Sequence, residues 1–222
     1  RPGCAAVPFF GTLRHPETMP TAPDTLIVLK ACPKGYTRDQ DKVCSPVDTI
    51  ARFRGRLKAC GLDILQEIRR VDNGRLDIPV YFSVCGAEAR RVIGSRKQMG
   101  KGASPEQSQA SACMELVERF SFFSFLENPA NFLTGDYAAV EAQGYPVLPL
   151  STLLASVHDH RHSPAMLGEL LAGLPLQWVW ARRLSDESAW LLPFGWFYAI
   201  NEFNGPAAGN TIEEATLQGI CE

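Results

Sequence analysis

The 222-residue chain has no long apolar run and no excess of charge of one sign. Its longest apolar stretch, residues 189–200, is interrupted by Pro193 and Gly195 and is far shorter than the roughly 18 residues of a membrane-spanning helix. Lysine and arginine number 22 and aspartate and glutamate 24, which gives a formal charge of −2. A chain so close to neutral has no global field for nucleic acid or an anionic membrane. We therefore predict neither a membrane span nor a nucleic-acid partner.

The chain also lacks paired cysteines. It contains seven cysteines at irregular spacing, and no two of them form a Cys-x-x-Cys motif. This pattern argues against both a disulfide framework and a zinc site. We expect free, buried or incidental thiols, and we predict a cytoplasmic protein.

Strand and helix signals alternate along the chain. Ser45 and Gly61 bracket a predicted helix with an apolar stripe through Val47 and Phe53. Further helices are predicted at 105–126, 136–143, 152–158 and 164–172 and after Thr211, and strands at 64–71, 76–84, 176–184 and 189–192. Ser151 and Ser163 are expected helix caps. Because the strands are joined by hairpins, the prediction is an α+β fold with a mixed, largely antiparallel sheet and packed helices.

Two segments share one layout, in which a capped helix carries acidic side chains. Ser104 is the expected N-cap of the first and Thr211 of the second, and each follows a glycine by two positions. A glutamine or glutamate three residues after each cap completes a predicted capping box. A glutamate follows eleven residues after each cap, at Glu115 and Glu222. This repetition indicates two helices that present carboxylates to one site.

The first of these helices has an acidic face. At 100° per residue, Ser111, Glu115 and Glu118 lie within about 60° of one another, and Arg119 flanks them. Carboxylates are hard oxygen ligands of the kind that Mg²⁺ takes together with substrate phosphates. The face is therefore a candidate Mg²⁺ site, and a solvated polar face is the alternative that periodicity leaves open.

Glycine-rich loops precede both helices, at residues 100–104 and 204–211. A loop of this kind, leading into a helix N-terminus, exposes backbone N–H groups that favour anions. Lys101 is placed to reach a phosphate there, an ordinary solvated lysine being the alternative. Neither loop is a P-loop, because the Gly-Lys-Ser/Thr sequence of that motif is missing.

Three motifs thus follow one another between residues 100 and 222. They are Gly100-Lys101-Gly102-Ala103-Ser104, then Ser111-Ala112-x-x-Glu115-x-x-Glu118-Arg119, then Asn204-Gly205-x-Ala207-Ala208-Gly209-Asn210-Thr211-x-Glu213-Glu214-Ala215. Together they resemble the YcaO family, and the combination is far more specific than any one motif. The resemblance implies that ATP and Mg²⁺ bind between the two helices. By match to the family motifs, the expected nucleotide ligands are Ser111, Asn210 and Lys101, and the expected metal ligands are Glu115, Glu118, Glu214 and Glu222.

The resemblance also implies a reaction. Members of the family use ATP to phosphorylate the oxygen of a peptide backbone amide, after which a nucleophile attacks the activated carbon and gives an azoline or a thioamide. We therefore expect a YcaO-type enzyme acting on a peptide or protein, with a partner protein or a homodimer as further expectations. No catalytic base is identifiable. Two alternatives remain: a non-catalytic ATP-binding accessory factor of a peptide or ribosomal-protein methylthiolation system, and an interaction domain that binds no nucleotide.

The ends of the chain suggest part of a longer protein. The chain begins at Arg1 and ends at Glu222, inside the second predicted acidic helix and before the rest of its Glu-x-x-Glu-Arg motif. We expect residues 1–44 to form an N-terminal extension. Residues 45–222 are expected to be the N-terminal portion of a YcaO-like ATP-binding domain that is incomplete at its C-terminus.

Overall fold

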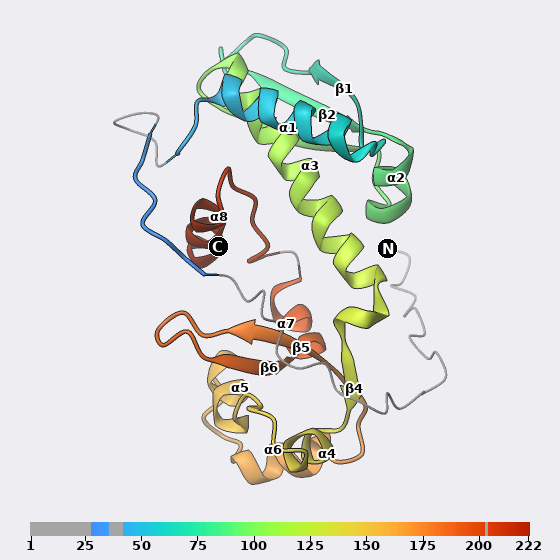
Figure 1. Cartoon of the computed structure of the whole chain (residues 1–222), viewed down its shortest axis with the longest axis vertical. Coiled ribbons are helices and arrows are strands. Elements are labelled where there is room, and N and C mark those ends of the chain that lie inside the picture. Colours follow the sequence, from blue (N-terminus) through green and yellow to red (C-terminus); the bar gives the residue numbers. More distant parts are fainter. Residues whose placement is uncertain (1–27, 36–41, 203) are drawn as a thin grey trace. The chain divides into compact units, whose positions relative to one another are not determined.

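The computed structural model describes residues 28–35, 42–202 and 204–222 (Figure 1). This described part contains eight α-helices, one short 3-10 helix and two antiparallel three-stranded sheets, which confirms the predicted α+β class. It divides into a larger unit, from Val28 to Phe132 and from Phe194 to Glu222, and a smaller unit, Leu133–Pro193. Most of the expected N-terminal extension lies outside the described residues, so its boundary at residue 44 stays a prediction.

The first helix of the larger unit forms where its caps predict. Helix α1 spans Pro46–Cys60. The Ser45 hydroxyl accepts a hydrogen bond from the Asp48 amide at 3.1 Å, and Gly61, at a φ of 65°, ends the helix in the left-handed conformation. The predicted apolar stripe is wrong at its first position, because Val47 is 59% exposed. The buried side chains of α1 are Thr49 and Phe53.

The sheet of the larger unit has the order β1-β2-β3. The strands are β1 (Leu65–Arg70), β2 (Val80–Cys85) and β3 (Lys97–Lys101), and helix α2 (Ala87–Ile93) joins the last two. Strand β2 begins later than predicted, because Asp72 accepts hydrogen bonds from the amides of Gly74 and Val80 and closes a wider connection. The sequence did not predict α2 or β3, whose basic side chains hide the usual strand and helix patterns.

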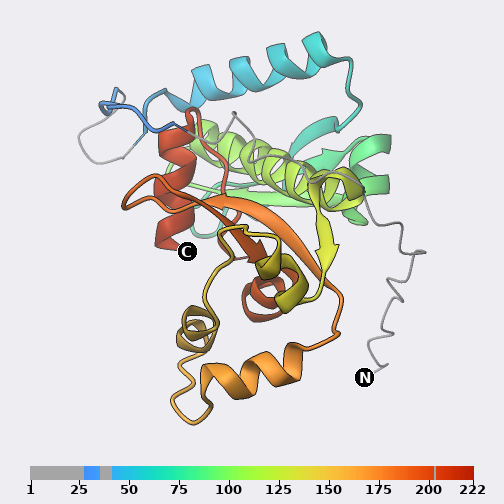
Figure 2. The same cartoon turned by 60° about the horizontal axis from the view of Figure 1, so that its bottom comes forward.

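The long helix α3 (Pro105–Glu127) lies between α1 and strands β2 and β3 (Figure 2). Its inner face joins the core of this unit, which is formed by Phe53, Ile64, Cys85, Ala89, Cys113 and Leu116. Strand β3 runs so close to α3 that a side chain at Gly100 would collide with the backbone of Ser108 and Ala112. The buried Ser108 hydroxyl also contacts the Gly100 carbonyl oxygen at 2.9 Å. This close packing fixes α3 relative to the sheet.

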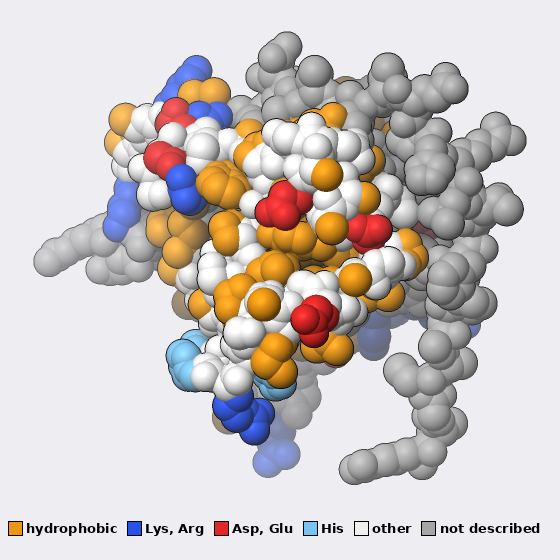
Figure 3. Space-filling view, turned by 90° about the horizontal axis from the view of Figure 1, so that it is seen from below, with side chains coloured by type: hydrophobic (Ala, Val, Ile, Leu, Met, Phe, Trp, Pro, Cys, Tyr) orange, Lys and Arg blue, Asp and Glu red, His pale blue; other side chains and the backbone are white. Residues whose placement is uncertain are grey.

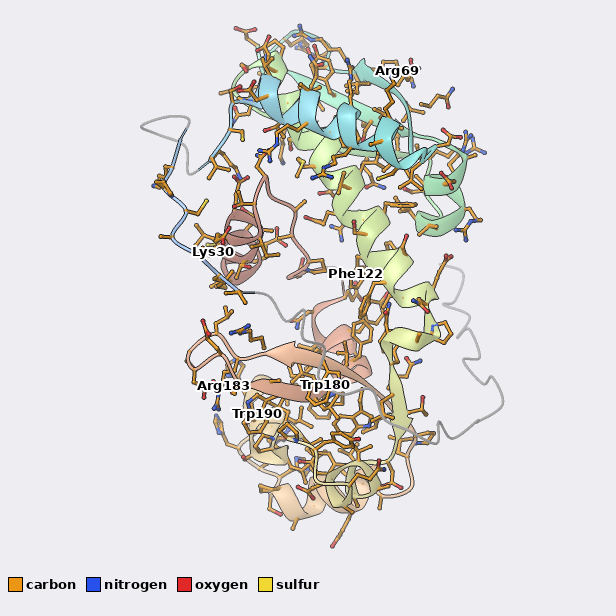
Figure 4. The ribbon with its side chains drawn as sticks, viewed as in Figure 1. Lys30, Arg69, Phe122, Trp180, Arg183 and Trp190 are labelled. Atoms are coloured by element: carbon orange, nitrogen blue, oxygen red, sulfur yellow. The ribbon has the colours of Figure 1, made fainter. Side chains whose placement is uncertain are left out.

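Three further helices complete the larger unit. They are the 3-10 helix η1 (Pro129–Asn131), α7 (Phe194–Asn201) and α8 (Ile212–Cys221). Phe122, near the end of α3, stacks on Tyr198 of α7 with ring centroids 6.2 Å apart (Figure 4). Helix α7 was not predicted, because its apolar residues continue the run that begins in the preceding strand. Aromatic contacts therefore hold α7 to α3.

The smaller unit has a sheet of the order β4-β5-β6 and three short helices. Its elements are β4 (Leu133–Gly135), α4 (Tyr137–Ala142), α5 (Leu150–Ser156), α6 (Pro164–Leu171), β5 (Leu176–Arg182) and β6 (Ala189–Pro193). Trp178 is fully buried and donates its indole N–H to the Gly135 carbonyl oxygen at 2.9 Å. The Arg183 guanidinium lies over the Trp190 ring, 5.0 Å from its centroid (Figure 4). Strands β5 and β6 pair antiparallel, with Trp180 opposite Leu191, which confirms the predicted hairpin.

One predicted cap in the smaller unit is wrong. Helix α5 begins at Leu150, with Pro149 as its N-cap, so Ser151 lies inside the helix rather than before it. Ser163 does cap α6, accepting from the Met166 amide at 3.2 Å.

Apolar side chains also reach the surface of this unit (Figure 3), and Leu170 is 71% exposed. None of the helices described here has the length and hydropathy of a membrane span.

Candidate functional site

The two acidic helices begin alike, as their shared layout predicts. The Ser104 hydroxyl accepts from the Gln107 amide at 3.2 Å, and the Thr211 hydroxyl accepts from the Glu214 amide at 3.2 Å. The glycine two positions before each cap lies in close contact with the first turn of its helix. A side chain at Gly102 would collide with Gln107, and one at Gly209 would collide with the backbone near Ala215. The glycines are therefore part of the turn that starts each helix.

Only half of each predicted capping box forms. The side chain of Gln107 accepts from the Ala103 amide at 2.7 Å instead of reaching back to the cap residue. The Glu214 carboxylate turns away as well: it accepts from the Val43 amide at 3.2 Å and lies 3.5 Å from the ammonium group of Lys42. Its side chain is only 7% exposed. Glu214 is thus held by residues that lie about 170 positions earlier in the sequence.

The acidic face of α3 carries its own counter-charge. Arg119 lies 3.1 Å from the Glu115 carboxylate and 3.7 Å from the Glu118 carboxylate. The side chain of Glu115 is 34% exposed, whereas that of Glu118 is 11% exposed. Ser111 lies one turn before Glu115 on the same face. One arginine is therefore shared between two carboxylates of very different burial.

Glu118 has an unusual proton affinity. The pKa of Glu118 is raised to about 7, first by burial and then by the negative charges of Glu115 and Glu222, against the opposing effect of Arg119. A backbone hydrogen bond from Ala208 also reaches this carboxyl group. A carboxylate that is buried with insufficient positive charge is stabilised by an added cation. The electrostatics of this face thus favour a cation.

Helix α8 presents a second polar row. Gln218 donates to the Glu222 carboxylate at 3.1 Å, and the Gly205 amide lies 3.4 Å from the other oxygen of that carboxylate. Asn210 precedes the helix and donates from its side-chain amide to Glu214 at 3.4 Å. The loop before α8 is therefore linked to the helix by two hydrogen bonds, from Asn210 to Glu214 and from the Gly205 amide to Glu222.

A cavity of about 310 Å³ lies between α3, α8 and the segment before α1. All seven residues expected to bind nucleotide or metal line it, namely Lys101, Ser111, Glu115, Glu118, Asn210, Glu214 and Glu222. Its size lies at the lower end of the range for small-molecule sites. Among the described residues, no three acidic, histidine or cysteine side chains converge closely enough to form a metal site by themselves. The four glutamates thus share a cavity without forming a ready-made metal cluster.

The cavity also contains residues that sequence reasoning missed. Lys42, Cys44 and Thr49 line it. Lys42 and Cys44 lie in the segment before α1, and Thr49 lies in α1 itself. Neither of these two regions contains a recognisable sequence motif. The one available signal was Thr49, a polar residue within the inward-facing part of an otherwise apolar helix face. The Arg52 guanidinium lies 2.9 Å from the sulfur of Cys44.

Comparison with known proteins supports the motif assignment. The family model described as YcaO cyclodehydratase, ATP- and Mg²⁺-binding, matches residues 99–222. An uncharacterized protein of Methanothermobacter thermautotrophicus is 27% identical over 183 residues, which are 80% of this chain and 44% of that protein. A protein encoded in the tfuA 3′ region of Rhizobium leguminosarum bv. trifolii is 23% identical over 206 residues, 87% of this chain and 44% of that protein. The chain therefore spans less than half the length of these relatives.

Two solved structures share the fold. The YcaO protein of Methanopyrus kandleri, solved with AMPPCP and Mg²⁺, has a TM-score of 0.51 at 22% identity, covering 81% of this chain and 42% of its own. A heterocyclase in complex with substrate and cofactor has a TM-score of 0.53 at 19% identity, covering 87% of this chain and 29% of its own. Since the family model matches more than half of the chain, including both acidic helices, this protein belongs to the YcaO family.

Proposed function

We propose that this chain supplies the Mg-ATP site of an enzyme that activates a peptide backbone amide by phosphorylating its oxygen. The observation that carries the proposal is the convergence of both acidic helices and their glycine-rich loops on one cavity. In this assignment Ser111, Asn210 and Lys101 contact the nucleotide. The metal ligands are Glu115, Glu118, Glu214 and Glu222.

The donor set of the cavity fits Mg²⁺ with a nucleotide. Each Mg²⁺ takes one or two carboxylates and completes its six ligands with phosphate oxygens and water, so four glutamates suit more than one ion. Each ion therefore does not require three converging protein ligands, which the described residues do not provide. The raised pKa of Glu118, due first to burial, points the same way, because a cation would offset the cost of its negative charge. Lys42 and Lys101 add positive charge at the same cavity.

The proposed chemistry follows from the low reactivity of a peptide amide. Its oxygen is a poor leaving group, so transfer of the terminal phosphoryl group of ATP to that oxygen converts it into a phosphate ester and releases ADP. A nucleophile of the substrate, or a sulfur donor, then bonds to the carbon, and the former amide oxygen leaves as part of inorganic phosphate. Bound Mg²⁺ neutralises charge as the phosphoryl group moves. The residues of this chain bind and orient the phosphates. An azoline or a thioamide is the proposed product.

Calorimetry with Mg-ATP on the complete protein tests the site. We expect saturable binding that falls at least about tenfold in Glu115→Ala, because an ionic contact to the metal or its shell is removed. Glu169→Ala is the control: Glu169 is an exposed acid on α6, outside the residues that line the cavity, and its loss should leave the affinity unchanged. If the complete protein binds no Mg-ATP, or Glu115→Ala binds as the wild type does, the nucleotide-site assignment is wrong.

ATP turnover then separates the enzyme from an accessory factor. If the protein activates an amide, ATP hydrolysis should rise when a peptide substrate is added. Binding of Mg-ATP without peptide-stimulated turnover would identify a non-catalytic ATP-binding factor instead. A peptide or protein substrate, a partner protein and a homodimer stay predictions for the longer protein.

A further inference from the structure

Thr49 of α1 is a buried polar side chain that contacts the loop before α8. Its residue is 5% exposed, and its hydroxyl lies 2.9 Å from the Ser45 carbonyl oxygen and 3.1 Å from the side-chain oxygen of Asn210. The contact with Asn210 joins residues 161 positions apart in the sequence, whereas Ser45 lies one helical turn before Thr49. A hydroxyl buried this deeply must be satisfied by partners in the protein.

The Thr49 contact belongs to a chain of hydrogen bonds that ends in the cavity. Thr49 faces the oxygen of the Asn210 amide, the nitrogen of the same amide faces Glu214 at 3.4 Å, and Glu214 is held from its other side by the Val43 amide. Asn210 and Glu214 both line the cavity. Thr49 therefore contacts one end of the Asn210 side-chain amide, and the other end faces Glu214.

We propose that Thr49 is a positioning residue of the nucleotide site, which acts by holding the side-chain amide of Asn210. This inference rests on the proposed Mg-ATP site and adds to it a residue on an element that carries no motif. Thr49 touches neither nucleotide nor metal in this role. It acts through Asn210 and, through Asn210, on Glu214.

A hydroxyl suits this position because it both donates and accepts. In the arrangement seen here, Thr49 faces the amide oxygen, and the amide nitrogen is directed to Glu214. If the side-chain amide of Asn210 rotates by 180°, its nitrogen donates to the Thr49 oxygen, and the Thr49 hydroxyl donates to the Ser45 carbonyl oxygen. The amide oxygen then faces Glu214, where two oxygens side by side suit a cation. A methyl group in place of the hydroxyl holds neither orientation.

The test uses Thr49→Val and Thr49→Ser in the complete protein, with the Mg-ATP dissociation constant measured by calorimetry. Thr49→Val keeps the shape of the side chain and removes the hydroxyl that contacts the Asn210 amide, so we expect about tenfold weaker binding. Thr49→Ser keeps the hydroxyl and should bind close to the wild type. Thr134→Val, at an exposed position on β4, controls for the substitution itself. Equal affinity of Thr49→Val and wild type would overturn the proposal.

A second measurement separates positioning from loss of folding. In an Asn210→Ala background the amide is gone, so Thr49→Val should cause no further loss of affinity. A full additional loss there would show that Thr49 acts by supporting the fold, and the proposal would be wrong. The unfolding midpoint of each variant is recorded alongside. Absence of Mg-ATP binding by the wild type would overturn the proposed function together with this inference. If the wild type binds Mg-ATP and Thr49→Val binds it equally well, the inference alone is overturned.

Discussion

The two acidic helices begin with the same cap and glycine, yet they are supported very differently. Helix α3 has 23 residues, and five of them are buried, including Cys113 and Leu116. Helix α8 has 10 residues and none that is buried, with Leu217 and Ile220 more than half exposed. The first helix is therefore held by apolar packing. Within the described residues, the second is held mainly by hydrogen bonds near its N-terminus.

The same difference appears in the carboxylates. Glu118 of α3 is buried near other acids and has a raised pKa, while Glu214 of α8 accepts hydrogen bonds from a backbone amide and from Asn210. Lys30 adds to this support, because its backbone amide donates to Glu213 at 2.9 Å beside α8 (Figure 4). A repeated motif thus places acids at one cavity through two different physical means.

The largest expected effect is on the packing of α3. Leu116→Ala removes a side chain with 0% exposure from the core, so we expect the free energy of unfolding to fall by about 3 kcal/mol. Leu217→Ala makes the same change at a position of α8 that is 51% exposed, and it should cost less than about 0.5 kcal/mol. Chemical denaturation of the complete protein measures both. Similar losses would mean that α8 packs against residues outside the described part.

Local signals predicted much of this fold. The caps Ser45, Ser104 and Thr211 each accept the hydrogen bond expected of them, because capping depends only on residues within one turn. Strand β3 escaped prediction for the opposite reason: Lys97–Lys101 has no strand-like apolar alternation, and it becomes a strand by pairing with β2 and packing on α3 at Gly100. Tertiary contact, rather than local preference, determines that element.

The site divides in the same way. The spacing of Ser111, Glu115 and Glu118 predicts one helix face, and the cavity indeed contains all three. Lys42 and Thr49 were not predicted, because long-range contacts bring them to α8 and to the loop before it. Helical periodicity describes which side chains share a face, but it contains no information on what that face meets.

A smaller effect is expected on the pH dependence of stability. The pKa of Glu118 is about 7 in the folded protein and about 4.5 as an unperturbed group. Between these values the folded state holds a proton that the unfolded state has lost, so stability falls as pH rises from 4.5 to 7. Glu118→Gln should remove this slope, on the order of 2 kcal/mol across the window. The measurement is denaturation at several pH values, without nucleotide or metal.

The comparison variant for this slope lies in α8. Glu214→Gln leaves Glu118 in its buried position, so the decline between pH 4.5 and 7 should persist in that variant. Glu115→Gln should keep most of it, since burial is the first cause of the raised pKa and the charge of Glu115 the second. If Glu118→Gln and wild type show the same slope, Glu118 is ionised in the folded protein at acidic pH, and the raised pKa assigned to it is wrong.

The smallest expected effect concerns the caps, which are chemically alike in the two helices. Ser104→Ala and Thr211→Ala each remove one N-cap hydrogen bond, worth about 1 kcal/mol. Because α3 is packed into the core, Ser104→Ala should lower the global unfolding midpoint. Because α8 has no buried residue, Thr211→Ala should instead loosen the first turn of α8 and speed hydrogen exchange at the Glu214 amide about fivefold, with little change in the midpoint. A lowered midpoint without faster exchange at Glu214 would mean that α8 unfolds only together with α3. The two helices would then differ in how many residues they bury, but α8 would not unfold locally.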